Sequence, residues 1–280
     1  MKRQVVSSLV LFLLAVLVWY PLLMLLTGAL LGPGELARRL GGVLGDAGAL
    51  AAWPLLPQQP TLGNLVKLLL DTPAFFRVFW NSCLQVFPAV AGQVLVGAPA
   101  AWALSRFRFR GREGLALLYT VLMILPFQVT MASSYLVLDW FSLVNTPWAV
   151  LLPSMFSAFP VFIMMKFFSK IPPSLLEAAR IDGAGELRLF LSIGLPMGAP
   201  GVLSAALLGF LEAWNAVEQP LTFLKDPGLF PLSIFLPQVS LENAGVSFVC
   251  ALVALLPPVL IFLYGQQYLE AGIVASGLKE

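Results

Sequence analysis

The chain has 280 residues, of which 59% are hydrophobic and 11% are charged, and its formal net charge is +2. Soluble globular proteins contain roughly 45–50% apolar and about 25% charged residues. The composition therefore excludes an ordinary soluble enzyme, a disordered chain, a disulfide-framed secreted domain and a nucleic-acid-binding protein. It predicts a protein whose main solvent is lipid.

The sequence contains few residues of the types that form catalytic or metal centres. Histidine is absent, which removes the commonest metal ligand and general base. Cys83 and Cys250 stand alone in apolar stretches, so they indicate neither a disulfide framework nor a zinc site. No phosphate-binding loop of the form G-x-x-x-x-G-K-[ST] occurs. We predict no catalytic residue, no metal, no cofactor and no enzymatic activity for this chain alone.

Long uncharged runs mark the predicted membrane spans, because a helix needs about 20 mainly apolar residues to cross the hydrocarbon core. Six such runs cover residues 4–34, 78–105, 114–138, 140–165, 189–211 and 243–269. A further run, 47–66, contains Pro54, Pro57 and Pro60, and prolines so close together would leave backbone groups unpaired in lipid. The first run is longer than the usual ~7–15-residue apolar region of a signal peptide, so we favour an uncleaved helix. We expect an all-α polytopic membrane protein with six transmembrane helices, forming one domain over residues 1–280.

The basic residues predict the orientation of these spans. With the N-terminus inside, the inner segments hold 11 Lys and Arg residues and the outer segments hold 5. Cytoplasmic loops carry the excess of basic residues, so both termini are predicted to be cytoplasmic, with Lys279 inside. The strongest local contribution is the RFRFRGR run at residues 106–112.

Loops of unequal length connect the predicted spans. We expect an outer loop at about 32–76 that includes the glycine-rich GGVLGDAG stretch, and an outer loop near 219–243 with a KDPG turn. The remaining loops are a basic inner loop near 106–113, an outer turn near 139–147, an inner segment over 166–197 and an inner tail after about 265. The inner segment is the most informative of them.

Within the stretch 166–197, residues 170–197 are too charged to span and too patterned for an irregular loop. From here on, the inner segment means residues 170–197. Prolines at 172 and 173 suit the start of a helix, and 174–181 is helix-favourable with an apolar stripe of Leu175, Leu176 and Ala179. Residues 182–185 should break the helix because Gly183 and Gly185 tolerate positive φ. A second short helix is predicted over 186–193, ended by Pro196. Residues alone leave two interpretations equally open: a functional helix–turn–helix, or an amphipathic connector.

The spacing of the inner segment resembles a family signature. Glu177-Ala178-Ala179, three residues, Gly183, nine residues and Ile193-Gly194-Leu195-Pro196 match the EAA motif of the permeases of binding-protein-dependent ABC importers (the type I, MetI-like family). Further stretches are similar to the carbohydrate branch and to its maltose-type second permease subunits: NSCLQV from Asn81, WALSRFRFRGR, the run from MILPFQV to LVNTPWAVLLP, Phe210 to Asn215, and the ending GQQYLEAGIVASG. Gln267 and Leu269 depart from that branch's usual ending. The similarity covers about 61–277.

The resemblance implies a bacterial inner-membrane permease that forms half of a translocation path for a sugar or oligosaccharide. Its implied partners are a second permease subunit, two cytoplasmic ABC ATPase subunits, an extracytoplasmic binding protein and the lipid bilayer that surrounds the spans. Residues implied to couple the chain to the ATPase are Glu177, Ala178, Ala179, Asp182, Gly183, Ile193, Leu195 and Pro196. Glu177 would make a charged contact, the alanines would allow close docking, and Gly183 would form the turn.

Amides and aromatic side chains in the spans are candidates for a sugar path. They are Asn81, Gln85, Gln128, Trp214 and Asn215, together with the intramembrane acid Glu212. Each of these types also serves commonly in packing or in hydrogen bonds between helices. Two other functions stay open: an ion-coupled transporter that works alone, which charge-poor spans disfavour, and a small membrane enzyme, which the lack of histidine disfavours. An importer of a non-sugar solute is also open.

Overall fold

The computed structural model of the protein describes residues 2–44, 53, 56–235 and 243–276. Within these ranges the chain is helical and has no β-strand; one isolated antiparallel bridge joins Leu31 and Pro60. The all-α fold class is confirmed. Lys279 and the end of the GQQYLEAGIVASG stretch lie outside the described residues.

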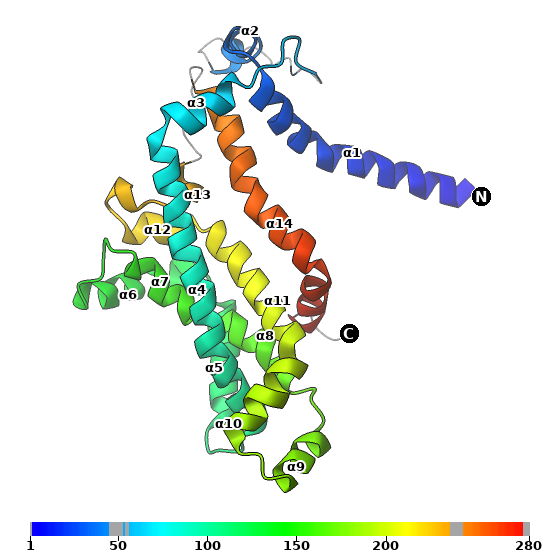
Figure 1. Cartoon of the computed structure of the whole chain (residues 1–280), viewed down its shortest axis with the longest axis vertical. Helices are drawn as coiled ribbons and strands as arrows, with labels where there is room; N and C mark the ends of the chain where they lie inside the picture. The colour runs from blue at the N-terminus through cyan, green and yellow to red at the C-terminus, as the bar shows by residue number, and fades with distance from the viewer. Residues whose placement is uncertain (1, 45–52, 54–55, 236–242, 277–280) are drawn as a thin grey trace. The chain divides into compact units, whose positions relative to one another are not determined.

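The chain divides into two compact units. Unit 1 comprises Met1–Val78 and Phe235–Pro257, and unit 2 comprises Phe79–Ile234 and Pro258–Glu280. The described helices of unit 1 are α1 (Lys2–Leu30), α2 (Pro33–Leu44), α3 (Gly63–Asp71) and the first parts of α4 (Pro73–Arg106) and α14 (Ala244–Ser276). Unit 2 holds the rest of α4 and α14, and also α5 (Arg112–Ile124), α6 (Phe127–Trp140), α7 (Trp148–Met155), α8 (Ala158–Phe168), α9 (Pro173–Ile181), α10 (Glu186–Leu189), α11 (Leu195–Trp214), α12 (Glu218–Phe223) and most of α13 (Leu232–Phe235) (Figure 1).

Five helical stretches of the described chain are long and apolar enough to cross a membrane: Ser7–Leu30, Pro73–Arg106, Trp148–Phe168, Glu186–Trp214 and Ala244–Tyr268. The remaining predicted span corresponds to α5 and α6, which meet the same criterion together but are bent by 106°. The bend has a local cause. Leu125 precedes Pro126 and is extended, with φ −67° and ψ 123°, because a residue before proline avoids the helical region. The six predicted spans are thus five stretches and one broken pair.

Unit 1 contains more helix than the predicted outer loop at 32–76 allows for. The helices α2 and α3 and the start of α4 all fall within it. Glu35 fixes this region, since its carboxylate is 6% exposed and accepts hydrogen bonds from the Gln58 N–H at 3.2 Å and from Arg39 at 3.2 Å. The GGVL residues at 41–44 end α2, and the rest of the GGVLGDAG stretch lies outside the described residues.

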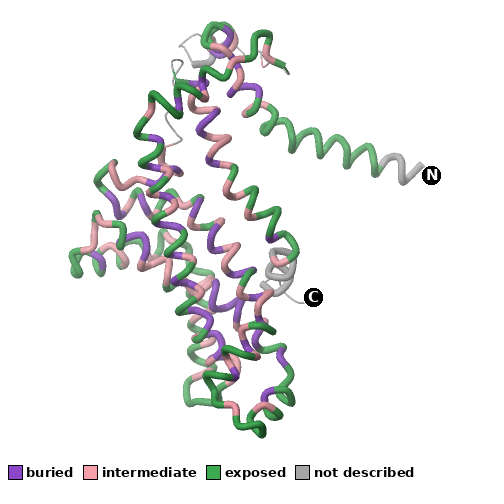
Figure 2. The backbone as a smooth tube through the Cα atoms, in the orientation of Figure 1, coloured by how far each residue is buried: buried purple, intermediate pink, exposed green. Residues whose placement is uncertain are grey.

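The first helix, α1, exposes an apolar surface. Every residue from Ser7 to Leu23 is exposed (Figure 2), and the most apolar window of the helix has no buried residue. Such a surface suits hydrocarbon rather than water, as the predicted first span requires.

The core of unit 2 lies where α4, α8 and α11 meet. Trp102 of α4 stands edge-on to Phe168 of α8, with ring centroids 5.5 Å apart, and lies 5.8 Å from the Phe190 ring. Leu176 of α9 and Leu189 of α10 belong to the same buried cluster. The core therefore reaches from the spans into the inner segment and holds that segment in place.

The guanidinium of Arg106 strengthens this attachment. It lies at the end of α4 and donates hydrogen bonds to the main-chain carbonyls of Phe168 and Ile171, the latter at 2.6 Å. These carbonyls end α8 and lead into α9, so the basic inner loop and the inner segment share one anchor.

Candidate functional site

The inner segment forms the predicted helix–turn–helix. In Figure 1, α9 and α10 lie at one end of unit 2, with α12 toward the other. Pro172 is extended and Pro173 opens α9, since a proline at the first helical position loses no intrahelical hydrogen bond. Leu176 is buried and Ala179 half-buried against the core, whereas Glu177 and Ala178 are exposed.

The predicted apolar stripe of α9 needs one correction. Leu175 is 41% exposed, so only Leu176 and Ala179 face the core. The cause is helical geometry: residues three apart lie on one face, while a neighbour in sequence points away by about 100°. The outward face of α9 thus includes Leu175, Glu177 and Ala178.

A complete Schellman motif explains the glycine of the turn. The Ala184 N–H donates to the Ala179 carbonyl and the Gly183 N–H to the Arg180 carbonyl, each at 3.0 Å. This pattern requires a left-handed residue at the position that Gly183 occupies, and its φ is +83°. An exposed salt bridge of 3.0 Å between Arg180 and Glu186 crosses the turn and adds little stability. Asp182 is exposed and caps α9 through its backbone.

The prediction that Pro196 ends the second helix is wrong. The helix α10 continues through a π-turn at Phe190–Gly194 directly into α11, where Pro196 occupies the first turn. A proline inside a helix removes one hydrogen bond, and its ring clashes with the carbonyl four residues earlier. The wider π-turn before Pro196 accommodates the ring, so the helix continues. Ile193 and Leu195 are half-buried against the core of unit 2, while Pro196 is exposed.

Glycines of the π-turn and of α11 allow close packing that the motif alone did not indicate. A Cβ at Gly194 would lie 2.7 Å from the Trp102 ring, and a Cβ at Gly198 or Gly201 would meet Phe168 or Phe167. Their spacing of four and three residues places them on one face of the helix. Small residues at this spacing are the signal, available in the sequence, of a close contact between membrane helices.

The candidate path residues do not form one group. Asn81 donates to the carbonyls of Gly228 and Phe230, and Gln85 donates to that of Leu229, so both amides hold the short 3-10 helix at Pro227–Leu229. Trp214 is 5% exposed and stacks on Phe210, with centroids 5.5 Å apart. These three side chains support structure around the site.

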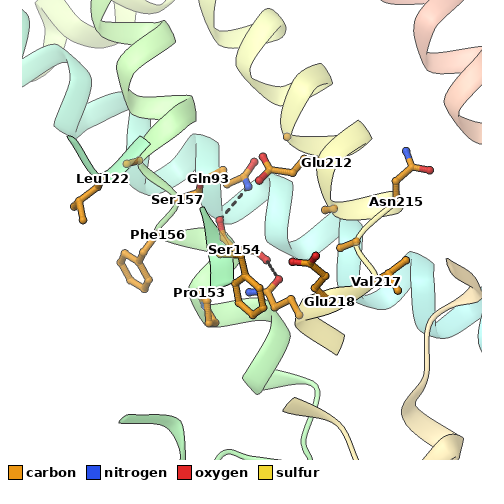
Figure 3. A pocket seen from close by; sticks show the side chains of 16 residues that line it. Gln93, Leu122, Pro153, Ser154, Phe156, Ser157, Glu212, Asn215, Val217 and Glu218 are labelled. Atoms are coloured by element: carbon orange, nitrogen blue, oxygen red, sulfur yellow. Dashed lines mark hydrogen bonds between the residues drawn. The ribbon is translucent and has the colours of Figure 1, made fainter. Parts of the chain in front are cut away.

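Glu212 and Asn215 instead line a cavity of about 570 Å³ within unit 2 (Figure 3). The other lining residues come from α4, α5, α6, α11, α12 and the α7–α8 region, and include Gln93, Ser154, Ser157, Gly209, Glu218 and Gln219. Gln128 is joined to this wall because its amide donates to both carboxylate oxygens of Glu218, at 2.7 and 2.6 Å. No group of three or more potential metal-ligating residues occurs in the described ranges.

Gln93, Ser154 and Glu218 were not among the predicted site residues. The Gln93 amide donates to the Ser154 carbonyl at 3.0 Å, and the Ser154 hydroxyl donates to Gln219 at 3.3 Å. Glu212 lies near the end of α11, which stops at Trp214, and Glu218 is the first residue of α12. The turn at 215–217, which returns the second acid to the same cavity, carries no sequence signal strong enough to predict it.

Comparison with known families shows which family the chain belongs to. The family model described as "Binding-protein-dependent transport system inner membrane component" matches residues 93–274, a range that contains both the inner segment and the cavity. The chain belongs to this family. It is therefore a transport-system component of a membrane.

Curated members of the family resemble most of the chain. The arabinooligosaccharides transport system permease protein AraQ of Halalkalibacterium halodurans is 29% identical over 80% of this chain and 81% of its own length. The galactooligosaccharides transport system permease protein GanQ of Bacillus subtilis is 27% identical over 99% of this chain and 96% of its own length. In fold, the chain is similar to a subunit of a bacterial ABC transporter involved in the import of the acidic polysaccharide alginate, with TM-score 0.80, 21% identity and coverage of 95% of this chain and 96% of that one.

Proposed function

We propose that the chain is one permease subunit of an ATP-driven importer and forms half of the translocation path for a carbohydrate. It works in a bacterial plasma membrane as a single transmembrane permease domain, beside a second permease subunit. Two cytoplasmic ABC ATPases and an extracytoplasmic binding protein complete the complex. The observation that carries the proposal is the family match over the inner segment and cavity, together with relatives named for oligosaccharide transport.

The inner segment is the ATPase-docking element in this proposal. Glu177 and Ala178 are exposed on the outward face of α9, while Leu176 and Ala179 hold that helix on the core. The Schellman turn at Gly183 fixes the angle between α9 and α10, and Asp182 lies exposed beside it. Ile193, Leu195 and Pro196 carry the docking motion into α11. A rigid turn suits this role because a loose hairpin would absorb motion rather than transmit it.

The lone chain is expected to be inactive, because the energy source is ATP bound elsewhere. Purified chain in liposomes should neither hydrolyse ATP nor take up a labelled oligosaccharide, with or without an ion gradient. The complete complex, with binding protein present, should take up the oligosaccharide only when ATP is supplied. Uptake by the lone chain under a proton or sodium gradient would instead support a secondary transporter.

Both termini are proposed to be cytoplasmic, following the 11-to-5 distribution of basic residues. A cysteine placed at Lys279 or Arg110, in a chain with Cys83 and Cys250 replaced, should react with an impermeant thiol reagent only after the membrane is opened. A cysteine at Ser142, in the turn between α6 and α7, should react in intact spheroplasts and serves as the matched control. External labelling at Lys279 would contradict this topology.

A further inference from the structure

The cavity of unit 2 presents two carboxylates and no cation. Glu212 and Glu218 are both exposed at its wall, and none of the described residues that line it is lysine or arginine. Glu218 accepts two hydrogen bonds from the neutral Gln128 amide, whereas the Glu212 carboxylate has no hydrogen bond or ion pair within the described chain. Unneutralised carboxylates give the cavity a negative potential, which a low-dielectric surrounding strengthens.

An unpaired buried acceptor points into the same place. Gln93 is 3% exposed. Its Nε2 donates to the Ser154 carbonyl, but its Oε1 has no hydrogen-bond partner. The absence of a side chain at Gly209, which also lines the cavity, leaves room for this oxygen. In Figure 3 the Gln93 amide and the Glu212 carboxylate point toward one another. A buried acceptor is costly to leave unpaired, so this arrangement calls for a donor supplied from the cavity.

Saccharide hydroxyls can meet this need, since each carries one O–H donor and can bond to a carboxylate or an amide oxygen. The carboxylate of a uronic acid cannot, because it has only acceptors when ionised and would face two like charges. We infer that this cavity admits saccharides without acidic groups, whose hydroxyls donate to Glu212, Glu218 and Gln93 Oε1, and that it rejects acidic saccharides. The inference rests on the proposed function and narrows its substrate class.

This selectivity is independent of the fold. The structure with the TM-score of 0.80 belongs to an importer of an acidic polysaccharide, yet only 21% of aligned residues are identical. A shared helical scaffold does not transfer the charge of a cavity, which depends on a few side chains. Glu212, Glu218 and Gln93 therefore carry the prediction, rather than the overall similarity.

The charge of the cavity can be measured without knowing the substrate. The reporter is Ser157→Cys in a chain lacking Cys83 and Cys250, expressed with its partner subunits in membrane vesicles. Ser157 lines the cavity and is half-buried. A cationic methanethiosulfonate reagent should modify it about tenfold faster than an anionic one, since nearby charges interact strongly at a protein surface. Ser133→Cys, exposed on α6 outside the cavity lining, should show no such preference.

Isosteric variants assign the preference to the two acids. Glu212→Gln and Glu218→Gln should each reduce the ratio of the two rates, and the double variant should bring it close to that of Ser133→Cys. Glu113→Gln removes an equal charge from unit 2 outside this cavity and should leave the ratio unchanged. Equal rates for the two reagents in the unaltered cavity would overturn the inference.

Ligand protection tests the substrate class with saccharides of matched length. Galactotetraose or xylotetraose at millimolar concentration should slow modification of Ser157→Cys, while tetragalacturonate should not. Protection by tetragalacturonate as good as that by the neutral tetramers overturns the inference, and so does protection by none of them. The proposed function is tested separately by ATP-dependent uptake in the complete complex, so loss of the cavity inference with uptake intact leaves the proposed function standing.

Discussion

Gly183→Val should abolish uptake while the chain still reaches the membrane at a near-normal level. The residue has φ +83°, where a non-glycine residue costs about 1–2 kcal/mol and a β-branched one more. A Cβ there meets nothing within 4 Å, so the damage comes from the backbone rather than from a clash. The turn should relax out of its Schellman geometry and change the angle between α9 and α10. Uptake and co-purified ATPase subunits are the two measurements.

The matched control is Gly183→Asn, because asparagine tolerates the left-handed conformation and should keep most of the activity. Glu177→Lys should resemble the valine variant through charge reversal on the exposed face of α9. Glu186→Lys should be milder, since Glu186 pairs only with Arg180 across an exposed turn. Normal transport by Gly183→Val, with its ATPases attached, would mean that the inner segment is a plain connector.

Gly194→Ala should lower the free energy of unfolding by about 1–3 kcal/mol, the usual cost of overpacking a well-filled core. The new Cβ would lie 2.7 Å from the Trp102 ring, which cannot move freely because Phe168 and Phe190 pack against it. Gly114→Ala is the control, as it lies in α5 with nothing within 4 Å of its Cβ. Since alanine favours helix over glycine, Gly114→Ala should be neutral or slightly stabilising.

The measurement is the thermal midpoint of detergent-solubilised chain, followed by size-exclusion chromatography with fluorescence detection. A midpoint for Gly194→Ala equal to that of Gly114→Ala would show that the contact between Trp102 of α4 and the π-turn at Gly194 is looser than the structure requires. That result would also mean that the core of unit 2 holds the inner segment less firmly than its contacts indicate.

The sequence indicated the spans and the turn of the inner segment because both depend on local chemistry. Uncharged runs report lipid burial directly, and Gly183 sits where a helix end demands a left-handed residue. The bend between α5 and α6 was also readable, since Leu125 precedes Pro126, but its angle of 106° depends on the packing of unit 2. The helical content of 32–76 was missed because α2 and α3 are short and leave no long apolar run. The continuity of α10 with α11 was missed because a π-turn at Phe190–Gly194, which the sequence did not indicate, accommodates Pro196 inside the helical stretch.

The cavity was harder to predict because it is assembled from distant parts of unit 2. Glu212 stood out as an acid within a span, but its neighbours Gln93 and Ser154 are separated from it by more than fifty residues. Asn81 and Gln85 looked equally suitable for a sugar path, yet their amides hold the loop at 228–230. The residue type determines which interactions a side chain can make. The tertiary structure decides whether a given polar side chain binds the backbone of a loop or lines the cavity.

The continuous helical stretch from Glu186 to Trp214 has a thermodynamic consequence. It begins in α10 and ends beside Glu212, so one element belongs both to the hairpin and to the cavity wall. Its 29 residues correspond to roughly 43 Å at 1.5 Å per residue. If docking at the hairpin shifts this element between two positions and changes the affinity of the cavity for solute by some factor, linkage requires that solute change the docking affinity by the same factor. A loaded cavity would then recruit or release the ATPase as strongly as the ATPase opens or closes the cavity.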